Sequence, residues 1–597
     1  MRPVVQLTDL HPLTFTLDGA PVEVEITDGE TLLSVLRERL GVTTVKDGCA
    51  PQGQCGCCTV LVDGDARVSC VTPAARVVGR GVTTLAGLEA EVRQSLVDAF
   101  VATGASQCGF CTPGIIVRLA ALATKGKTAP ADLDRALAAH LCRCTGWQTI
   151  YEAAALALAR DFLSADGQNH HPLDKKSREF EDAGRRAELE GGVPQTVGPA
   201  TPLGDGGFAD DTAPRDAWVA VPCPPDRDAE TVRAAGIDWV VGETLDQARW
   251  LAGKVQGRRT SRADSTPLPL PDLPDGGVRL ATGWVEPGYL EPDASWCSPS
   301  GVPASTLANG GAFGGKAASV APGAARELAD ALGRTMRTVF AREDVVRLGP
   351  KRPPVAASAV ARDGRIEIRG TAAGVMPALV APYAIEIDAR WTVRPLDGPP
   401  VSDALRAVGL AEQMVLVEGA IDAAEWDRTR LLADDERALA VLLDTLACSE
   451  SGALAGARVD IDDVTGEIAG VQVRVDAADP LDAVVLRSYV IGAAHMALGW
   501  VLTEGIAVDP DTGEVLDLTI RSFGIIRPKA MPPITVEIIS PAPSLGGTGV
   551  REPRAGASDA VFAAVAAATW NAVARVEGRR PETFPAVDTR AARMLRR

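Results

Sequence analysis

Nine of the twelve cysteines in this 597-residue chain lie before residue 145, in tight local groups. Cys57 and Cys58 are adjacent, and a single residue separates Cys142 from Cys144. Twelve cysteines could form disulfides in a secreted chain or bind metal in an intracellular one. Thiols this close in sequence converge on one point more readily than they bridge a fold. Because residues 1–6 show neither an apolar signal core nor a twin arginine, we expect a cytoplasmic protein whose cysteines bind metal.

The first group of cysteines has the spacing of an iron–sulfur loop. Its members are Cys49, Cys55, Cys58 and Cys70. The plant-type [2Fe–2S] pattern is C-x₄-C-x₂-C…C, and here five residues and then two separate the first three cysteines. Glycines in the loop let backbone N–H groups curl around a cluster and its sulfides. Zinc is the main rival, but it favours paired C-x₂-C knuckles, and a cysteine-filled core is the plainer alternative. Cys57 is left over as a small buried residue.

The second group combines two cysteine pairs that stand at helix starts. Its members are Cys108, Cys111, Cys142 and Cys144. Pro113 and Thr145-Gly146 are placed to begin a helix directly after each pair. Two helix N-termini would then point at the site, where their dipoles favour an anionic cluster. The sequence therefore predicts a second metal cluster inside a helical bundle.

The surrounding periodicity predicts the elements that position these groups. Residues 13–26 alternate apolar and polar around Asp18-Gly19, which is typical of a hairpin. Residues 30–40 follow with a helical pattern, and residues 59–62 form a strand after the first cysteine loop. From residue 85 to 161 the pattern is helical throughout. A β-grasp, ferredoxin-like domain followed by an all-helical domain is the expected arrangement.

The run Cys108-Gly-Phe-Cys-Thr-Pro-Gly with Cys142-Arg-Cys-Thr-Gly resembles the helical [2Fe–2S] domain of the molybdenum hydroxylases, the family of xanthine dehydrogenase and aldehyde oxidoreductase. The preceding β-grasp domain fits the same family, and the pattern covers residues 1 to about 165. The resemblance implies two [2Fe–2S] clusters, with all four cysteines of the second group as ligands. It also implies that Gln107 and Cys144 touch the pterin of a molybdenum cofactor.

Two later motifs resemble parts of that family's molybdenum-binding subunit. Gly310-Gly-Ala-Phe-Gly-Gly-Lys316 resembles the glycine-rich loop over the molybdenum, where glycines let backbone N–H groups approach an oxyanion. The cofactor contacts implied there are Gly311, Ala312, Phe313 and Gly314. Gly549-Val-Arg-Glu-Pro553 resembles the turn that carries the catalytic base, a role that falls on Glu552. A ligand-free turn and a solvated glutamate are the plainer alternatives.

The predicted fold class is α+β and multidomain, ending in shortened α/β molybdopterin-binding domains. The expected boundaries are 1–85 for the ferredoxin-like domain, 86–165 for the helical [2Fe–2S] domain, 166–193 for an exposed linker, 194–288 for a hammerhead-like α/β domain, and 289–597 for a molybdopterin-binding-like domain.

The departures from the family fall at the molybdenum site. Arg551 stands where the family has glycine, and Tyr489 and Met496 stand where it has glutamines that contact the pterin. Two hypotheses follow. In the first, a molybdenum-dependent hydroxylase oxidises an aldehyde or N-heterocycle with water, and electrons leave through both clusters. In the second, the chain is an iron–sulfur electron-transfer or scaffold subunit with a degenerate molybdenum site beside a separate catalytic chain. Retention of Gln107, the glycine loop and Glu552 favours the first.

Composition limits the partners. The net charge of −18 argues against nucleic acid or an anionic membrane surface. The most apolar run, residues 560–576, is interrupted by Asn571 and Arg575, so we expect a buried helix and no membrane span. No segment resembles the family's FAD domain, so a flavin would belong to a separate subunit. The expected partners are an electron acceptor or FAD subunit and a small-molecule substrate, with a second molybdenum-subunit chain as a further candidate.

Overall fold

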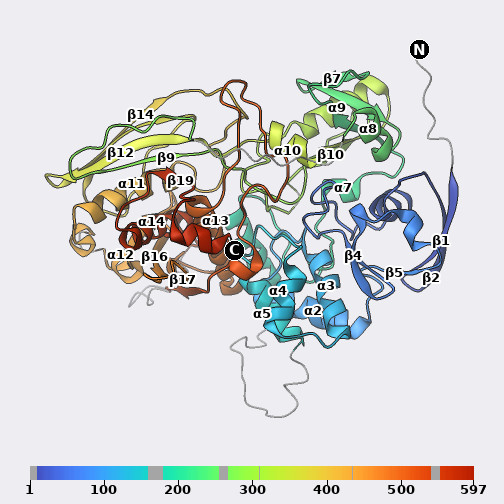
Figure 1. The fold of residues 1–597 in the computed structure, drawn as a ribbon, viewed down its shortest axis with the longest axis horizontal. Helices are drawn as coiled ribbons and strands as arrows, with labels where there is room; N and C mark the ends of the chain where they lie inside the picture. Colours follow the sequence, from blue (N-terminus) through green and yellow to red (C-terminus); the bar gives the residue numbers. More distant parts are fainter. Residues whose placement is uncertain are drawn as a thin grey trace, which may run out of the picture.

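The computed structural model describes residues 10–158, 179–254, 266–307, 309–432, 435–539 and 552–596. Four β-sheets organise this part of the chain, with helices between and around them (Figure 1). The mixed α+β multidomain fold that the sequence predicts is confirmed.

The N-terminal sheet has the strand order β2-β1-β5-β3-β4. Its strands are β1 (His11–Leu17), β2 (Ala20–Ile26), β3 (Thr59–Val62), β4 (Asp65–Val68) and β5 (Gly81–Thr83). The predicted hairpin is confirmed, since β1 and β2 pair antiparallel around Asp18 and Gly19, which both take positive φ. The helical pattern becomes α1 (Leu32–Ser34) continued by a π-helical turn, η1 (Val35–Arg39), packed under the sheet.

Four helices form the next unit, at the bottom of Figure 1: α2 (Ala90–Thr103), α3 (Thr112–Thr124), α4 (Pro130–Leu137) and α5 (Gln148–Leu158). One hydrophobic core runs from the N-terminal sheet through this bundle and includes the eight cysteines of both groups and Cys57. The two units are therefore packed as one body around the candidate metal sites.

Residues 179–193 differ from the predicted exposed linker. They form α6 (Phe180–Gly191), which packs through Ala183 and Ala187 against α13 (Ala483–Leu502). The side chain of Arg186 is fully buried and pairs with Glu190 at 3.0 Å. The charges of Arg186 and Glu190 thus satisfy each other inside the fold, whereas the polarity of the segment suggested that it was exposed throughout.

The second sheet has the order β10-β11-β6-β8-β7. Its strands are β6 (Trp218–Pro222), β7 (Val232–Ala234), β8 (Ile237–Gly242), β10 (Ala294–Cys297) and β11 (Met336–Val339), flanked by α8 (Leu245–Leu251) and α9 (Ala321–Leu332). The predicted boundary at residue 288 does not follow the sheets. β9 (Val278–Thr282) lies before it but pairs with β12 in the third sheet. β10 and β11 lie after it but belong to the second sheet, where β11 pairs with β6 and β10 pairs with β11.

The C-terminal half encloses three long helices between two sheets (Figure 1). The third sheet is β14-β13-β12-β9-β19 and the fourth is β15-β16-β17-β18. Their remaining strands are β12 (Val355–Arg362), β13 (Arg365–Ala372), β14 (Glu386–Val393), β15 (Thr445–Cys448), β16 (Leu454–Ile461), β17 (Ile468–Asp476), β18 (Ile534–Ile538) and β19 (Thr583–Phe584). Between them lie α11 (Leu410–Ala423), α13 and α14 (Ala557–Glu577).

Two helices of the described residues, α13 and α14, are long and apolar enough to cross a membrane by length and composition. In each, 89% of the most apolar stretch is buried inside the fold, as in core helices of this length. The buried helix predicted at residues 560–576 is α14.

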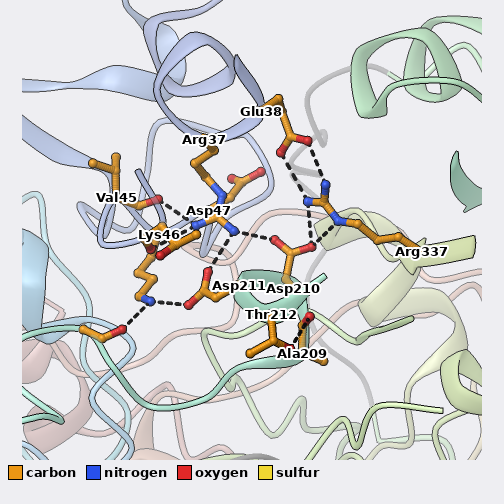
Figure 2. A network of polar contacts seen from close by, with 12 residues as sticks. Arg37, Glu38, Val45, Lys46, Asp47, Ala209, Asp210, Asp211, Thr212 and Arg337 are labelled. Atoms are coloured by element: carbon orange, nitrogen blue, oxygen red, sulfur yellow. Dashed lines mark hydrogen bonds and ion pairs between the residues drawn. The ribbon is translucent and has the colours of Figure 1, made fainter. Parts of the chain in front are cut away.

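A buried ion-pair network joins the N-terminal domain to the second sheet (Figure 2). Arg37 donates to Asp210 at 2.7 Å and to Asp211 at 2.9 Å, and Arg337 bridges Asp210 and Glu38. Lys46, which is fully buried, also pairs with Asp211. Burial opposes ionisation of Asp210, but the guanidinium groups of Arg337 and Arg37 outweigh it and hold its pKa below the usual range. The network therefore fixes how the first cysteine domain sits on the rest of the chain.

Replacing Asp210 with alanine should destabilise the chain strongly, because two buried arginines lose a shared counter-ion. We expect the free energy of unfolding to fall by about 3–5 kcal/mol, measured by urea denaturation. Because the folded-state pKa of Asp210 is depressed, its contribution is present above the ordinary aspartate range and lost as the pH falls below it.

The matched control is Asp238→Ala, which removes a pair with Arg233 whose side chains are both more than half exposed. We expect that loss to be below about 1 kcal/mol. Equal destabilisation by the two substitutions would contradict a structural role for the network.

Candidate metal centres

The first cysteine group lies on the loop between η1 and β3 and on the turn after β4. All four predicted ligands are buried, with exposed fractions of 1–3%. The Cys49 sulfur accepts N–H groups from Gln52 at 3.1 Å and Gln54 at 3.5 Å, and the Cys58 sulfur accepts the N–H of Cys70 at 3.5 Å. Backbone donors aimed at sulfur are what an anionic cluster requires.

These thiols lie close enough to perturb one another. Interactions with the Cys55 and Cys70 thiols hold the pKa of Cys49 well below its usual range, in opposition to burial. Interactions with Cys49 and Cys58, together with burial, raise the pKa of Cys70. Four buried thiols in contact cannot all ionise unless a cation joins them, and iron ions of a cluster would serve as that cation.

The second group lies just before α3 and α5. The helix start predicted at Pro113 is confirmed, since α3 begins at Thr112. The start predicted at Thr145-Gly146 is wrong, because Gly146 and Trp147 take positive φ and α5 begins only at Gln148. The sulfur atoms of Cys108 and Cys144 are 3.5 Å apart. An interaction with the Cys111 thiol, together with hydrogen bonds from Thr145, lowers the pKa of Cys142 to about 7 against the effect of burial. The four thiols thus form two pairs, Cys108 with Cys144 and Cys111 with Cys142.

This pairing fits [2Fe–2S] clusters better than single ions. A tetrahedral zinc site needs four ligands around one point, whereas each iron of a [2Fe–2S] cluster takes two protein ligands. We therefore infer that each group holds one such cluster.

The two groups are neighbours. Leu141, beside Cys142, donates its backbone N–H to the carbonyl oxygen of Cys55 at 2.9 Å. Next to it, His140 contacts the hydroxyl of Thr59 at 3.2 Å. Cys57 is buried between the groups, and its thiol interacts electrostatically with Cys108. Electrons on one cluster would have a short path to the other.

The glycine-rich loop lies on the second group. Gly311 has φ of +80°, and a side chain there would meet Cβ and Sγ of Cys108 at 2.6 and 2.8 Å. Asn309, just before the loop, donates its amide to the carbonyl oxygen of Cys108 at 2.9 Å. Ala312 lines a small cavity together with Cys108, whereas Phe313 and Gly314 line a different cavity. The carbonyl oxygen of Phe313 accepts the N–H of Arg406. The structure thus brings the predicted loop against the second cluster site.

The face of the second group predicted to meet a pterin is covered by the chain itself. The Gln107 amide donates to the carbonyl oxygen of Cys144 and to the hydroxyl of Ser488, both at 2.9 Å. Tyr489 donates to the side chain of Gln195 at 2.5 Å, just after α6. Gly492 of α13 lies so close to Cys144 that an added Cβ would be 1.8 Å from its carbonyl oxygen.

The cavity in contact with Cys108 and Cys144 measures only about 10 Å³, roughly the space that one water needs. A larger cavity of about 460 Å³ is lined by Phe313, Gly314, Arg406 and Asp559, but its lining includes neither Gln107 nor Cys144. The cysteines therefore fit two [2Fe–2S] clusters, while a pterin in contact with Gln107 and Cys144 does not fit this arrangement.

Glu552, the predicted base, lies at the surface. Its side chain is 87% exposed and is 3.6 Å from Arg185, itself more than half exposed. The preceding residues 540–551, including Arg551, lie outside the described part of the chain. The structure does not bring Glu552 together with the cysteines, and an exposed carboxylate lacks the enclosure that a base at a metal requires.

Sequence reasoning missed three residues that complete the second site: Gln195, Asn309 and Glu504. Asn309 contacts Cys108, Glu504 contacts Arg143, and Gln195 contacts Tyr489 of α13. Each comes from a distant part of the chain, so no local spacing indicates it. Arg143 lies between two predicted ligands in the Cys142-Arg-Cys motif, but the sequence did not indicate its partner, Glu504.

Serine substitutions should separate ligands from the extra cysteine. We expect Cys58→Ser to abolish the electron paramagnetic resonance (EPR) signal of the first cluster, because it removes a thiolate ligand, and to leave the second signal unchanged. Cys142→Ser should do the reverse.

Cys57→Ser is the matched control, since this buried thiol neighbours both groups without being a predicted ligand. It should retain both signals. Loss of the first signal in Cys57→Ser with retention in Cys58→Ser would show that the ligand set is wrong.

Comparison with known proteins agrees with these sites. Residues 15–78 match the family described as 2Fe-2S iron-sulfur cluster binding domain, and residues 84–155 match the [2Fe-2S] binding domain. The xanthine dehydrogenase iron-sulfur-binding subunit of Escherichia coli O157:H7 is 43% identical over 139 residues, which are 23% of this chain and 86% of that protein. The isoquinoline 1-oxidoreductase subunit alpha of Brevundimonas diminuta is 40% identical over 23% of this chain and 91% of its own length.

Longer relatives show the same fold beyond the iron–sulfur part. Aldehyde oxidoreductase of Megalodesulfovibrio gigas is 43% identical over 138 residues, 22% of this chain and 15% of that protein. The solved structure of the aldehyde oxidoreductase from Desulfovibrio gigas superposes with a TM-score of 0.69 at 15% identity, covering 98% of this chain and 100% of that one. The enzyme from Desulfovibrio desulfuricans gives 0.67 at 16% identity, over 98% and 100% of the two chains. The chain therefore belongs to the molybdenum hydroxylase family of oxidoreductases, which includes xanthine dehydrogenase and aldehyde oxidoreductase.

Proposed function

We propose that this chain is an electron-transferring subunit that carries electrons through two [2Fe–2S] clusters between a separate catalytic chain and an acceptor. The observation that carries the proposal is the second cysteine group, which is complete in ligands yet covered by the chain's own side chains where a pterin would lie. When bound, each cluster accepts and releases one electron without a bond being made or broken.

The chain's own residues hold the two cluster sites close together for electron transfer and keep water away from them. The backbone bond from Leu141 to Cys55 holds the two cluster loops together. Every predicted ligand is at most 8% exposed, which excludes water from the clusters. Val71, which follows Cys70 directly, is 48% exposed, so the first cluster lies just under the surface. We infer that electrons leave there, towards an FAD subunit or another acceptor protein.

The relatives that this chain spans almost completely carry names of iron–sulfur subunits, which supports the same role. All twelve cysteines are free, as expected for a cytoplasmic protein in a reducing compartment. A partner chain with the molybdenum centre would supply the electrons.

A second function, hydroxylation of an aldehyde or N-heterocycle at a molybdenum centre in this chain, has one observation in its favour. The 460 Å³ cavity adjoins Phe313 and Gly314 of the glycine-rich loop, and buried Arg406 lines it. A small-molecule substrate would fit there, although the covered face of Cys144 leaves no contact with the second cluster site.

Elemental analysis of the purified full-length chain separates the two functions. We expect about four irons per chain, two EPR signals after reduction, and molybdenum far below one per chain even from molybdate-replete cells, because the pterin face is closed.

Near-stoichiometric molybdenum and pterin would contradict the electron-transfer proposal and favour the hydroxylase. Glu552→Gln would then test catalysis, with loss of turnover but unchanged iron content as the result expected of a base. Zinc in place of iron would overturn both functions.

A further inference from the structure

A buried arginine stands between two ligands of the second cluster site. Arg143 lies between Cys142 and Cys144 and is 3% exposed. Its guanidinium forms a bidentate ion pair with Glu504, with both N–O distances 2.6 Å. Glu504 is 1% exposed, so the pair is shielded from solvent. A charge in such surroundings acts over a longer range than one at the surface.

The partners of Arg143 come from distant segments. Glu504 follows the C-terminal end of α13, and the Nε of Arg143 donates to the carbonyl oxygen of Pro287 at 2.9 Å. Arg143 lines both the small cavity beside Cys108 and Cys144 and a second cavity that it shares with Glu504. The cation therefore faces the cluster site on one side and its counter-ion on the other.

We propose that the Arg143–Glu504 pair sets the reduction potential of the second [2Fe–2S] cluster. This inference rests on the iron–sulfur assignment in the proposed function. One-electron reduction adds a negative charge to an already anionic cluster, so a nearby cation stabilises the reduced form and a nearby anion the oxidised form. Glu504 offsets the charge of Arg143 and so keeps the potential lower than the arginine alone would.

Other charges near the pair have partners of their own. Glu286 pairs with Lys351 at 2.8 Å, and Arg352 pairs with Glu412 at 2.6 Å. Both terminal nitrogens of Arg143 donate to Glu504, which is therefore the counter-ion of this arginine. Removing the Glu504 charge would leave the cation beside the cluster uncompensated.

The test is an EPR-monitored redox titration of the full chain with both clusters assembled. Glu504→Gln keeps the size of the side chain and removes its charge, so the midpoint potential of the second cluster should become more positive. At a fixed ambient potential, the ratio of reduced to oxidised second cluster should rise by about tenfold or more. The first cluster serves as the internal reference and should titrate as in the unmodified chain.

Two further variants show that charge is responsible. Glu504→Asp retains the charge and should titrate close to the unmodified chain. The double variant Arg143→Gln with Glu504→Gln removes both charges and should return the potential most of the way towards that of the unmodified chain.

Glu418→Gln is the matched control, because Glu418 is also a fully buried carboxylate paired with an arginine, Arg428. The same carboxylate accepts hydrogen bonds from the hydroxyl of Tyr383 and the backbone N–H of Leu446, and no cysteine of the described chain is among its partners. It should leave both potentials unchanged. An unshifted second cluster in Glu504→Gln, or loss of its signal there, would overturn the proposal and leave the pair a structural role. Absence of both signals in the unmodified chain would instead refute the iron–sulfur function itself.

Discussion

Eight predicted cysteine ligands lie buried in two adjacent groups, and their ionised forms would repel one another in an interior without water to screen them. Much of the surrounding structure offsets this repulsion or keeps the groups packed together. Backbone N–H groups of Gln52 and Gln54 point at Cys49, and two helices begin at the second group. One core packs the ferredoxin-like sheet against the helical bundle around both groups. Without iron these thiols could not all ionise, and the backbone N–H groups aimed at sulfur would have fewer anions to stabilise.

The second group shows how a family fold can be retained while one of its contacts is replaced. The chain follows the aldehyde oxidoreductase fold along nearly its whole length, yet at only 15–16% identity. Gln107 is present but bonds to Cys144 and Ser488, and Gln195 engages Tyr489. Tyr489 and Met496 stand where the resemblance places pterin-contacting glutamines, and α6 and Arg406 pack against these two side chains. In the proposed electron-transfer role, this packing takes the place of a pterin contact and leaves the cluster ligands in position.

Buried ion pairs hold the separate units in register. Arg37, Asp210 and Arg337 join the ferredoxin-like domain to the second sheet, and Arg143 with Glu504 joins the helical bundle to the end of α13 (Figure 2 shows the first of these). Breaking such a pair leaves an uncompensated charge in the interior, which is far more costly than the loss of a surface pair. The orientation of the cluster domains is thus specified by electrostatics as well as by apolar packing.

The sequence by itself determined the local features. Cysteine spacing identified both cluster sites, Pro113 indicated where α3 begins, and alternation around Asp18-Gly19 predicted the first hairpin, because each depends on neighbours within a few residues. The family, the α+β class and the glycine-rich loop also followed from short motifs. Other features depend on contacts between distant segments, and only the tertiary structure decided them. They are the helix α6 inside the predicted linker, the strand pairing across the predicted boundary at residue 288, the exposure of Glu552 and the pairing of Arg143 with Glu504. The sequence does not distinguish a polar or charged side chain that is solvated by water from one that is paired with a buried partner. Only the folded chain shows which of the two surrounds it.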